Sequence, residues 1–294
     1  MADPPGSLLK WASIALGKEA TVASVTGLHD GSSPWRLRVV SPDATAEAIL
    51  RTAFDPPRWP GSPMARSKLA RGVAALNVAE QHGLAAPRLI ACDLDGHEAG
   101  LPASLETVLP GNGGWPQTPT AAGWRDAGAA IARVHRVTLQ PQEHLPLLRP
   151  VFPSRSRSTP LLQLADELVR RYEWPRGDPV FLHHDLWPGN LLWIGDRCVG
   201  LIDWKEAHVG NPGVDLANLR FHAAMLHGPD AAVLVLEGWE DEIGRKATDV
   251  AYWDAVWALF SRDALDEFLK PPFNEYGSTD GGDAFLRAAV DQLV

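Results

Sequence analysis

FLHHDLWPGNLLWIGDRCVGLIDWKEAHVGNPGVDLA, residues 181–217, is the stretch of this 294-residue chain that decides its fold. It contains two short apolar runs, 191–194 and 198–202, on either side of the turn sequence Gly195-Asp196-Arg197. Two such runs joined by a short polar turn predict a β-hairpin. The residues before it, Leu186-Trp187-Pro188-Gly189, include proline and glycine and therefore predict an irregular loop.

Three side chains with hard oxygen atoms bracket this hairpin. Asp185 begins the loop, Asn190 ends it, and Asp203 follows the second strand. If the strands pair in register, Asn190 and Asp203 return to the same open end of the hairpin, with Asp185 a few residues away. Magnesium takes one or two protein carboxylates together with phosphate oxygens and water. Asp and Asn are also common at turns, but three at this spacing favour a magnesium site.

The order of these residues resembles the protein-kinase-like superfamily and, more narrowly, the aminoglycoside phosphotransferase family, which shares its fold with choline kinases and other small-molecule kinases. Residues 183–190 read HHDLWPGN, where that family commonly has His-Gly-Asp-Leu-x-Pro-Gly-Asn. The triplet Ile202-Asp203-Trp204 and the stretch 210–217 are similar to the family's next two elements. Weaker similarity extends the resemblance to residues 20–225.

The resemblance implies a role for each residue of the motif. Asp185 is expected to be the catalytic carboxylate, which accepts the proton of the acceptor hydroxyl and orients it toward the γ-phosphate. Asn190 and Asp203 are expected to hold Mg²⁺. His183 is expected to pack under the loop and bond to backbone. Asp215 resembles the acid that braces this loop. It could also cap a helix over 216–225, and both roles could hold together.

The resemblance also implies a site for ATP, or possibly GTP, in the first part of the chain. Arg51 takes the place of the phosphate-binding cation that is often lysine in kinases, and an arginine can bind phosphate through two nitrogens. Glu106, Thr107 and Val108 are expected to offer backbone groups to the purine edge. The chain departs from the family at Gly72, where a helix glutamate usually pairs with that cation. Either another acid orients Arg51, or the alignment is shifted by one turn.

Local patterns predict a small lobe followed by a larger one. Strands are predicted over 35–40, 46–53, 88–91 and 103–109, and residues 25–35 are predicted to form a loop over the phosphates. A helix is predicted from a Ser62 cap to Gly83, with Leu69, Val73 and Leu76 on its apolar face. After a connector rich in Gly and Pro, helices are predicted over 121–137 and 159–172, and the pattern is mainly helical from 215 onward.

These elements predict an α+β protein with a two-lobed, protein-kinase-like fold. Residues 1–109 would form a nucleotide-binding lobe with an antiparallel sheet and one helix. Residues 110–294 would form a larger, mainly helical lobe that carries catalysis and substrate binding.

Composition limits the classes of function. The chain has 45% hydrophobic and 21% charged residues, which is typical of globular proteins. A net charge of −9 argues against a nucleic-acid partner. Two cysteines cannot form a disulfide framework and suit a reducing cytoplasm. The sequence shows neither an apolar stretch long enough to span a membrane nor the apolar core of a signal peptide.

The charge is concentrated in the larger predicted lobe. Residues 1–111 hold 11 acidic and 10 basic residues, whereas residues 112–294 hold 25 acidic and 17 basic residues. An acidic lobe favours a cationic small molecule as the hydroxyl acceptor. The predicted function is therefore Mg²⁺–ATP-dependent transfer of phosphate to a hydroxyl of an amine-bearing molecule, of the aminoglycoside or amino-sugar type.

Three alternatives stand beside this prediction. Zinc could bind His183, His184 and Asp185, although adjacent residues rarely point at one metal. A protein kinase would share the motif, but Trp187-Pro188-Gly189 resembles the small-molecule branch and no Ala-Pro-Glu segment follows Asp203. A pseudokinase would bind a nucleotide or ligand without transferring phosphate. The departure at Gly72 keeps this alternative open, whereas the intact set of Asp185, Asn190 and Asp203 argues against it.

Overall fold

The protein is described by a computed structural model over residues 4–29, 32–53, 63–114, 116, 119–148, 159–175, 177–268 and 279–294. It divides into two compact units. The first comprises Met1–Pro110, Glu143–Leu145 and Leu201–Ala207, and the second comprises the remaining segments. The segment 201–207, which the sequence assigned to the larger lobe, thus clusters with the first unit.

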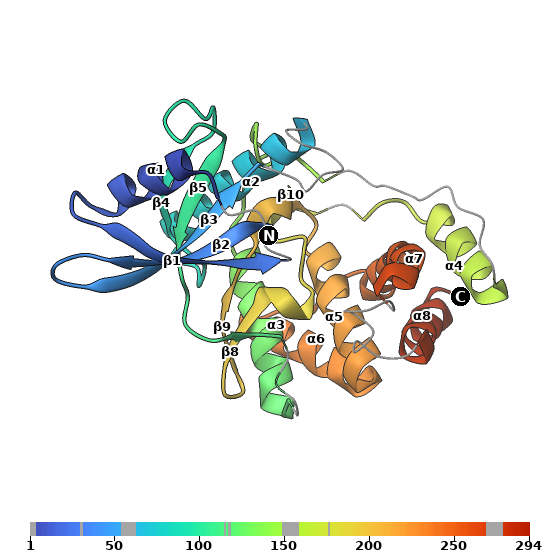
Figure 1. The fold of residues 1–294 in the computed structure, drawn as a ribbon. Coiled ribbons are helices and arrows are strands. Elements are labelled where there is room, and N and C mark those ends of the chain that lie inside the picture. The colour runs from blue at the N-terminus through green and yellow to red at the C-terminus, as the bar shows by residue number, and fades with distance from the viewer. Residues whose placement is uncertain are drawn as a thin grey trace. The chain divides into compact units, whose positions relative to one another are not determined.

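The first unit is built on a five-stranded antiparallel sheet with the order β1-β2-β3-β5-β4 (Figure 1). Its elements are α1 (Gly6–Leu16), β1 (Thr21–His29), β2 (Ser32–Val40), β3 (Thr45–Thr52), α2 (Pro63–Gln81), β4 (Leu89–Asp93) and β5 (Ala103–Thr107). A 3₁₀ turn over Trp204–Glu206 packs against α2 in the same unit.

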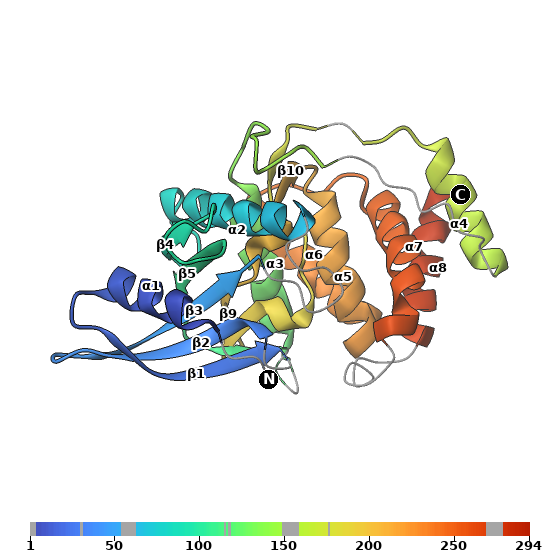
Figure 2. The same ribbon diagram turned by 45° about the horizontal axis from the view of Figure 1, so that its top comes forward.

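Alternation along the strands sends different chemistry to the two faces of this sheet. Leu50 of β3 lies opposite Leu105 of β5, and both belong to a buried core with Leu8 and Trp11 of α1. The residues that flank Leu50 and Leu105 along each strand point to the other face of the sheet. Arg51 is one of these, and it lies in register with Ser104 of β5. Helix α2 packs against β4 and β5 (Figure 2). The sheet therefore carries an apolar face for α1 and a polar face around Arg51.

The predicted helix of this unit is confirmed as α2. Leu69, Val73 and Leu76 are buried along it, and Gly83 adopts the left-handed conformation (φ 65°) just after its end. The predicted cap, Ser62, lies outside the described residues.

Two expectations for this unit are wrong. The prediction of one helix fails because α1 forms as well, with Leu8, Trp11 and Ala12 buried at helical spacing. The segment 25–35 is not simply a loop, because 25–29 belong to β1 and 32–35 to β2, which pair as a hairpin. Residues 30 and 31 at its tip lie outside the described residues.

The second unit is mainly helical. Its elements are β6 (Asn112–Gly113), α3 (Ala121–His135), α4 (Pro160–Arg171), β7 (Val180–Leu182), β8 (Leu191–Ile194), β9 (Arg197–Leu201), β10 (His208–Gly210), α5 (Gly213–His227), α6 (Pro229–Ile243), α7 (Val250–Phe268) and α8 (Thr279–Leu293). Strands β6, β8 and β9 form one small sheet, and β7 pairs with β10 in another. The hairpin and the helices predicted near 121 and 159 are confirmed.

Glycines set the closest helix contact in this unit. Helix α3 packs against α6, and an added Cβ at Gly128 would lie 2.0 Å from the backbone oxygen of Val235. The same atom at Gly238 of α6 would lie 2.0 Å from the oxygen of Arg125. Neither position has room for a side chain, so this crossing requires glycine on both helices. Trp239, which follows directly, is 1% exposed and belongs to the core.

No helix among the described residues has both the length and the apolarity that a membrane span requires.

Candidate active site

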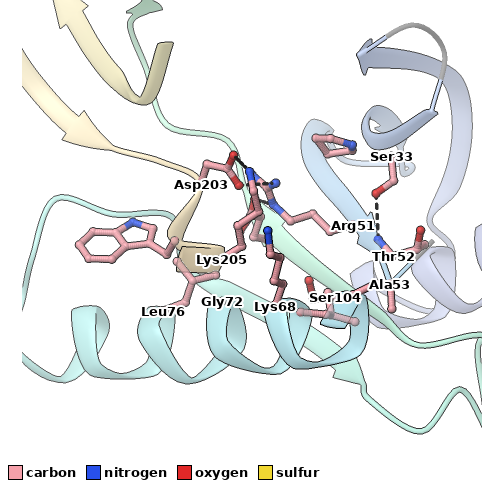
Figure 3. Close-up of a pocket in the computed structure, with 15 residues that line it drawn as sticks. Ser33, Arg51, Thr52, Ala53, Lys68, Gly72, Leu76, Ser104, Asp203 and Lys205 are labelled. Carbon is pink, nitrogen blue, oxygen red and sulfur yellow. Dashed lines mark hydrogen bonds and ion pairs between the residues drawn. The ribbon is translucent and has the colours of Figure 1, made fainter. Parts of the chain in front are cut away.

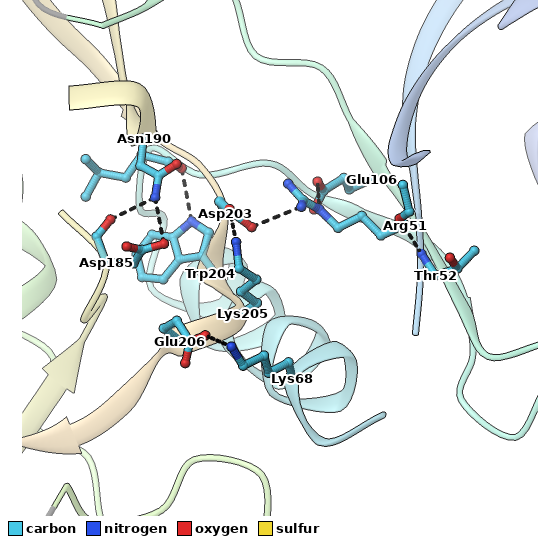
Figure 4. Close-up of polar contacts among 12 residues, drawn as sticks. Arg51, Thr52, Lys68, Glu106, Asp185, Asn190, Asp203, Trp204, Lys205 and Glu206 are labelled. Atoms are coloured by element: carbon cyan, nitrogen blue, oxygen red, sulfur yellow. Dashed lines mark hydrogen bonds and ion pairs between the residues drawn. The ribbon is translucent and has the colours of Figure 1, made fainter. Parts of the chain in front are cut away.

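The loop predicted to carry catalysis lies between β7 and β8 in the second unit. Residues 183–187 form an irregular segment, Pro188–Asn190 form a 3₁₀ turn, and β8 and β9 follow as the hairpin. Within the loop, Asn190 donates from Nδ2 to the backbone oxygen of Asp185 at 2.8 Å and to its carboxylate Oδ2 at 3.1 Å (Figure 4). Because Nδ2 is engaged in this way, the oxygen Oδ1 of Asn190 is the atom that could bind a cation.

Asp215 fixes the start of this loop from helix α5. Its carboxylate is fully buried and accepts hydrogen bonds from the backbone nitrogens of His183 at 2.7 Å and His184 at 2.8 Å. Asp215 is the third residue of α5, whose N-cap is Pro212, so the alternative that it caps this helix is wrong. The carboxylate instead satisfies two buried backbone donors that a loop cannot pair by itself.

His135 completes the support of this carboxylate. Trp239 donates from Nε1 to His135 Nδ1 at 2.9 Å, and an indole N–H can only donate. His135 Nδ1 therefore carries no proton, and its Nε2–H donates to Asp215 Oδ2 at 3.2 Å. Burial alone would raise the pKa of Asp215, but the hydrogen bond from His135 and the electrostatic attraction of nearby imidazoles hold that pKa below its ordinary value.

The two adjacent histidines have different surroundings. His183 is fully buried, and its Nδ1 accepts a hydrogen bond from the backbone nitrogen of Asp185 at 3.3 Å. His184 adopts the left-handed conformation (φ 63°), and its ring lies edge-on to His208 at 4.9 Å. That conformation favours glycine, which explains why Gly is common at this place in the similar sequences. Among the residues that the structure describes, no group of three or more His, Cys, Asp or Glu is arranged to hold a metal.

Arg51 finds its acids within the first unit, and neither lies on helix α2. Its Nε donates to Glu106 Oε1 at 2.6 Å, and its Nη1 donates to Asp203 Oδ1 at 3.0 Å (Figure 4). Glu106 and Arg51 lie on the same face of neighbouring strands, offset by two residues. Burial opposes the charge on Arg51, but both carboxylates outweigh it and hold the pKa of the guanidinium above its ordinary value.

Helix α2 carries two cations, Lys68 and Arg71, close to Gly72, where the family pattern has an acid. Lys68 lies 2.5 Å from Glu206 Oε1, and Arg71 lies 3.4 Å from Glu206 Oε2. Gly72 faces the backbone of Lys205, whose Cα lies 3.7 Å from the position of an added Cβ. The 3₁₀ turn after Asp203 therefore packs closely on α2, and a glutamate at 72 would extend into this contact. The glutamate that the family pattern has at 72 is absent here, and an acid on the sheet, Glu106, pairs with Arg51 in its place.

A cavity of about 230 Å³ lies beside these residues within the first unit (Figure 3). Three cations line it, Arg51, Lys68 and Lys205, together with the carboxylates of Glu106 and Asp203. Its apolar wall is formed by Ala53, Ala65, Leu69 and Leu76. A cavity with three cations and two carboxylates suits an anionic ligand and its counter-cation.

Asp203 itself is held in a defined geometry. It adopts the left-handed conformation (φ 67°), and its side chain is 13% exposed. Arg51 binds its Oδ1 and Lys205 binds its Oδ2 (Figure 4). The donors that the sequence assigned to Mg²⁺ are thus a carboxylate in the first unit and an amide oxygen beside a carboxylate in the second. All are hard oxygen atoms, and this donor chemistry fits Mg²⁺.

One expectation for the purine edge needs correction. The backbone nitrogen of Thr107 donates to the oxygen of Arg88 at 2.9 Å, and its hydroxyl accepts from the nitrogen of Arg88 at 2.9 Å. That amide is therefore engaged and does not offer a donor to a base. The backbone roles of Glu106 and Val108 stay predictions. The side chain of Glu106, which no sequence motif singles out, is the principal acid partner of Arg51.

Comparison with known proteins places the chain in a family. A sequence model described as the phosphotransferase enzyme family matches residues 24–255. The homoserine kinase of Nitrobacter hamburgensis is 30% identical over 148 residues, which cover 43% of each chain. The chain thus spans less than half the length of such curated relatives.

Solved structures show the same fold at low identity. The macrolide 2′-phosphotransferase of Brachybacterium faecium superposes with a TM-score of 0.61 at 15% identity, covering 96% of this chain and 98% of that one. A spectinomycin phosphotransferase in complex with ADP and spectinomycin superposes with a TM-score of 0.55 at 11% identity, covering 93% of each chain. The predicted kinase-like fold is confirmed. From the family match over most of its length, this chain belongs to the phosphotransferase enzyme family.

Proposed function

We propose that this protein transfers the γ-phosphate of ATP to a hydroxyl of a small, amine-bearing molecule, with Mg²⁺ as cofactor. The observation that carries the proposal is the braced loop of the second unit. Asp215 binds the backbone of His183 and His184, and Asn190 binds both the backbone and the carboxylate of Asp185. A carboxylate held from both ends is suited to orienting one hydroxyl with little loss of freedom during the reaction.

In this mechanism Asp185 accepts the hydrogen of the acceptor hydroxyl and points its oxygen at the γ-phosphate. An ordinary aspartate has a pKa of ~3.9, which makes it too weak a base to ionise an alcohol in the ground state. The loose transition state of phosphoryl transfer makes this unnecessary, because the proton leaves late and orientation is the main contribution. Asp203 and the Oδ1 of Asn190 would hold Mg²⁺, which supplies charge neutralisation at the phosphates when bound.

Arg51 is the proposed phosphate-binding cation. Its guanidinium is fixed by Glu106 and Asp203 and lines the cavity of the first unit. Backbone groups of Glu106 and Val108 are proposed to reach the purine. ATP is favoured over GTP because the solved spectinomycin phosphotransferase of this fold binds ADP. The departure at Gly72 keeps open the alternative of a binding protein without activity, and the pairing of Arg51 with Glu106 supports the proposal against it.

The acceptor is proposed to carry both an amine and a hydroxyl. Residues 112–294 hold 25 acidic against 17 basic residues, which favours cations. Homoserine, the substrate in the name of the curated relatives, and spectinomycin both combine amines with hydroxyls. Trp239 and Trp253 are 1% and 2% exposed and belong to the core, so neither is proposed to stack on the acceptor. The thiols of Cys92 and Cys198 are free, which suits the cytoplasm as the site of action.

The experiment is phosphate transfer from γ-labelled ATP with Mg²⁺ to pooled acceptors. The pool contains homoserine, choline, amino sugars, aminoglycosides and macrolides. We expect one labelled product, and we expect Asp185→Asn to lower its rate by roughly 10²–10⁴-fold. Asp241→Asn, which alters an exposed acid on α6, is the matched control and should keep the wild-type rate. Full activity in a correctly folded Asp185→Asn variant would overturn the mechanism.

A further inference from the structure

Both oxygen atoms of the Asp203 carboxylate have a cationic partner in the arrangement that the structure shows. Arg51 occupies Oδ1, and the ammonium of Lys205 occupies Oδ2. A divalent cation bound to this carboxylate would share an oxygen with one of the two side chains and would repel it at short range. This repulsion is expected to weaken one of the two contacts when a metal binds Asp203.

The two side chains differ in how firmly they are held. Arg51 is 20% exposed and is also bound to the buried carboxylate of Glu106, so the sheet retains it. Lys205 is 41% exposed, and Asp203 is its ion-pair partner in the described part of the chain. A lysine is a point charge on a flexible four-carbon stem, whereas an arginine is a rigid fork with several donors. Lys205 is the contact that can leave at lower cost.

The surroundings of Lys205 offer its ammonium a second place to bind. Lys205 lines the same cavity as Arg51 and Lys68 (Figure 3). Lys68 is held by Glu206, and Arg51 is the proposed ligand of the nucleotide phosphates. An ammonium released from Asp203 into this cavity would meet the phosphates that accompany the metal. Its charge would oppose binding of the metal alone and favour binding of the metal with a triphosphate.

We propose that Lys205 is a positioning residue that exchanges between Asp203 Oδ2 and the nucleotide phosphates. It holds the carboxylate of Asp203 in place before the metal binds and stabilises the phosphates afterwards. This inference rests on the proposed function, and it assigns to Lys205 the coupling between metal binding and nucleotide binding at that site.

The test measures Mn²⁺ binding by electron paramagnetic resonance, first without nucleotide and then with a non-hydrolysable ATP analogue. For Lys205→Met we expect Mn²⁺ alone to bind about fivefold more tightly, because a competing charge worth up to about 1 kcal/mol is removed. With the analogue present, we expect binding to be about tenfold weaker, because a phosphate ligand is lost. Lys205→Arg keeps the charge and should restore binding with the analogue to within about twofold of wild type.

Lys246→Met is the matched control, since Lys246 pairs with the carboxylate of Glu240 as Lys205 pairs with Asp203 but does not line this cavity. It should leave both measurements within twofold of wild type. Weaker binding of Lys205→Met in both measurements would identify a merely structural role and overturn the proposal, as would no change in either or a change in only one. Asp203→Asn tests the proposed metal site separately from the role of Lys205. If this variant binds Mn²⁺ as tightly as wild type does, the proposed metal site itself is wrong.

Discussion

At the scale of single residues, the ion pair of Arg51 with Glu106 joins two neighbouring strands of the sheet of the first unit. We expect Glu106→Gln to lower the free energy of unfolding by about 2 kcal/mol, because it leaves a mostly buried guanidinium with one carboxylate instead of two. Glu47→Gln is the control, since the Arg36–Glu47 pair has the same chemistry but is 45% and 43% exposed. Urea unfolding of the three proteins measures both effects. Equal midpoints for Glu106→Gln and wild type would contradict this account.

What the sequence could predict at this scale follows from where the partner lies. Asp185 and Asn190 are five residues apart, and their contact was implied by a local motif. Glu106 is 55 residues from Arg51, and its role depends on β3 lying beside β5. His135 is 80 residues from Asp215 and depends on helix packing. Residues that act within one loop are accessible from spacing, whereas partners supplied by another element require the topology.

At the scale of elements, the α3–α6 crossing gives the sharpest prediction. Gly128→Ala should lower the free energy of unfolding by about 1–3 kcal/mol, because its Cβ would lie 2.0 Å from the oxygen of Val235 and the helices must separate. Gly72→Ala is the matched control in α2, where the nearest atom lies 3.7 Å away. There the better helix propensity of alanine should raise the free energy of unfolding by up to about 1 kcal/mol. Differential scanning calorimetry measures both variants, and two shifts of the same sign would contradict the packing argument.

Most elements could be predicted because their periodicity and caps are local. Thr159 caps α4 through Leu162, as its position before Pro160 indicates. Helix α1 was missed although Leu8, Trp11 and Ala12 have helical spacing, because the segment is short and follows two prolines. The β1–β2 hairpin was missed at residues 25–29 because polar and glycine residues there resemble a loop. Pairing with β2 supplies the stability that local propensity lacks.

At the scale of the whole molecule, the partly buried His222 couples stability to pH. Burial lowers the pKa of His222 from 6.5 to about 4. Between these values the unfolded chain binds a proton that the folded chain does not, so stability is present above pH 6.5 and is lost as pH falls toward 4. We expect a loss of about 2 kcal/mol between pH 8 and pH 5 from this group.

Urea unfolding at pH 5, 6 and 8 measures this loss, and His222→Gln should remove it. His144→Gln, which alters an exposed histidine, should keep the pH dependence of the wild type. An unchanged slope in His222→Gln would show that other groups cause the loss.

The two units of the protein do not divide at a single point in the sequence. Leu201–Ala207 clusters with the first unit, although the hairpin that precedes it belongs to the second. A sequence read from one end to the other suggests a single boundary near 110, because composition and periodicity change there. A short segment that joins a unit formed by distant residues, as 201–207 does, causes no such change in composition or periodicity. Asp203 lies in this segment and therefore belongs to the same unit as Arg51.

The origin of Arg51's counter-charges also bears on how such a site can be regulated. In protein kinases a strand lysine must pair with a helix glutamate, so movement of the helix can switch the enzyme off. Here Glu106 and Asp203 both lie outside α2, and the helix contributes only Lys68 and Arg71, which bind Glu206. A displacement of α2 would break those two pairs and leave the guanidinium compensated. Among the described residues, α2 thus supplies no charge that pairs with Arg51, and a displacement of the helix would leave the contact of Arg51 with Glu106 on β5 in place.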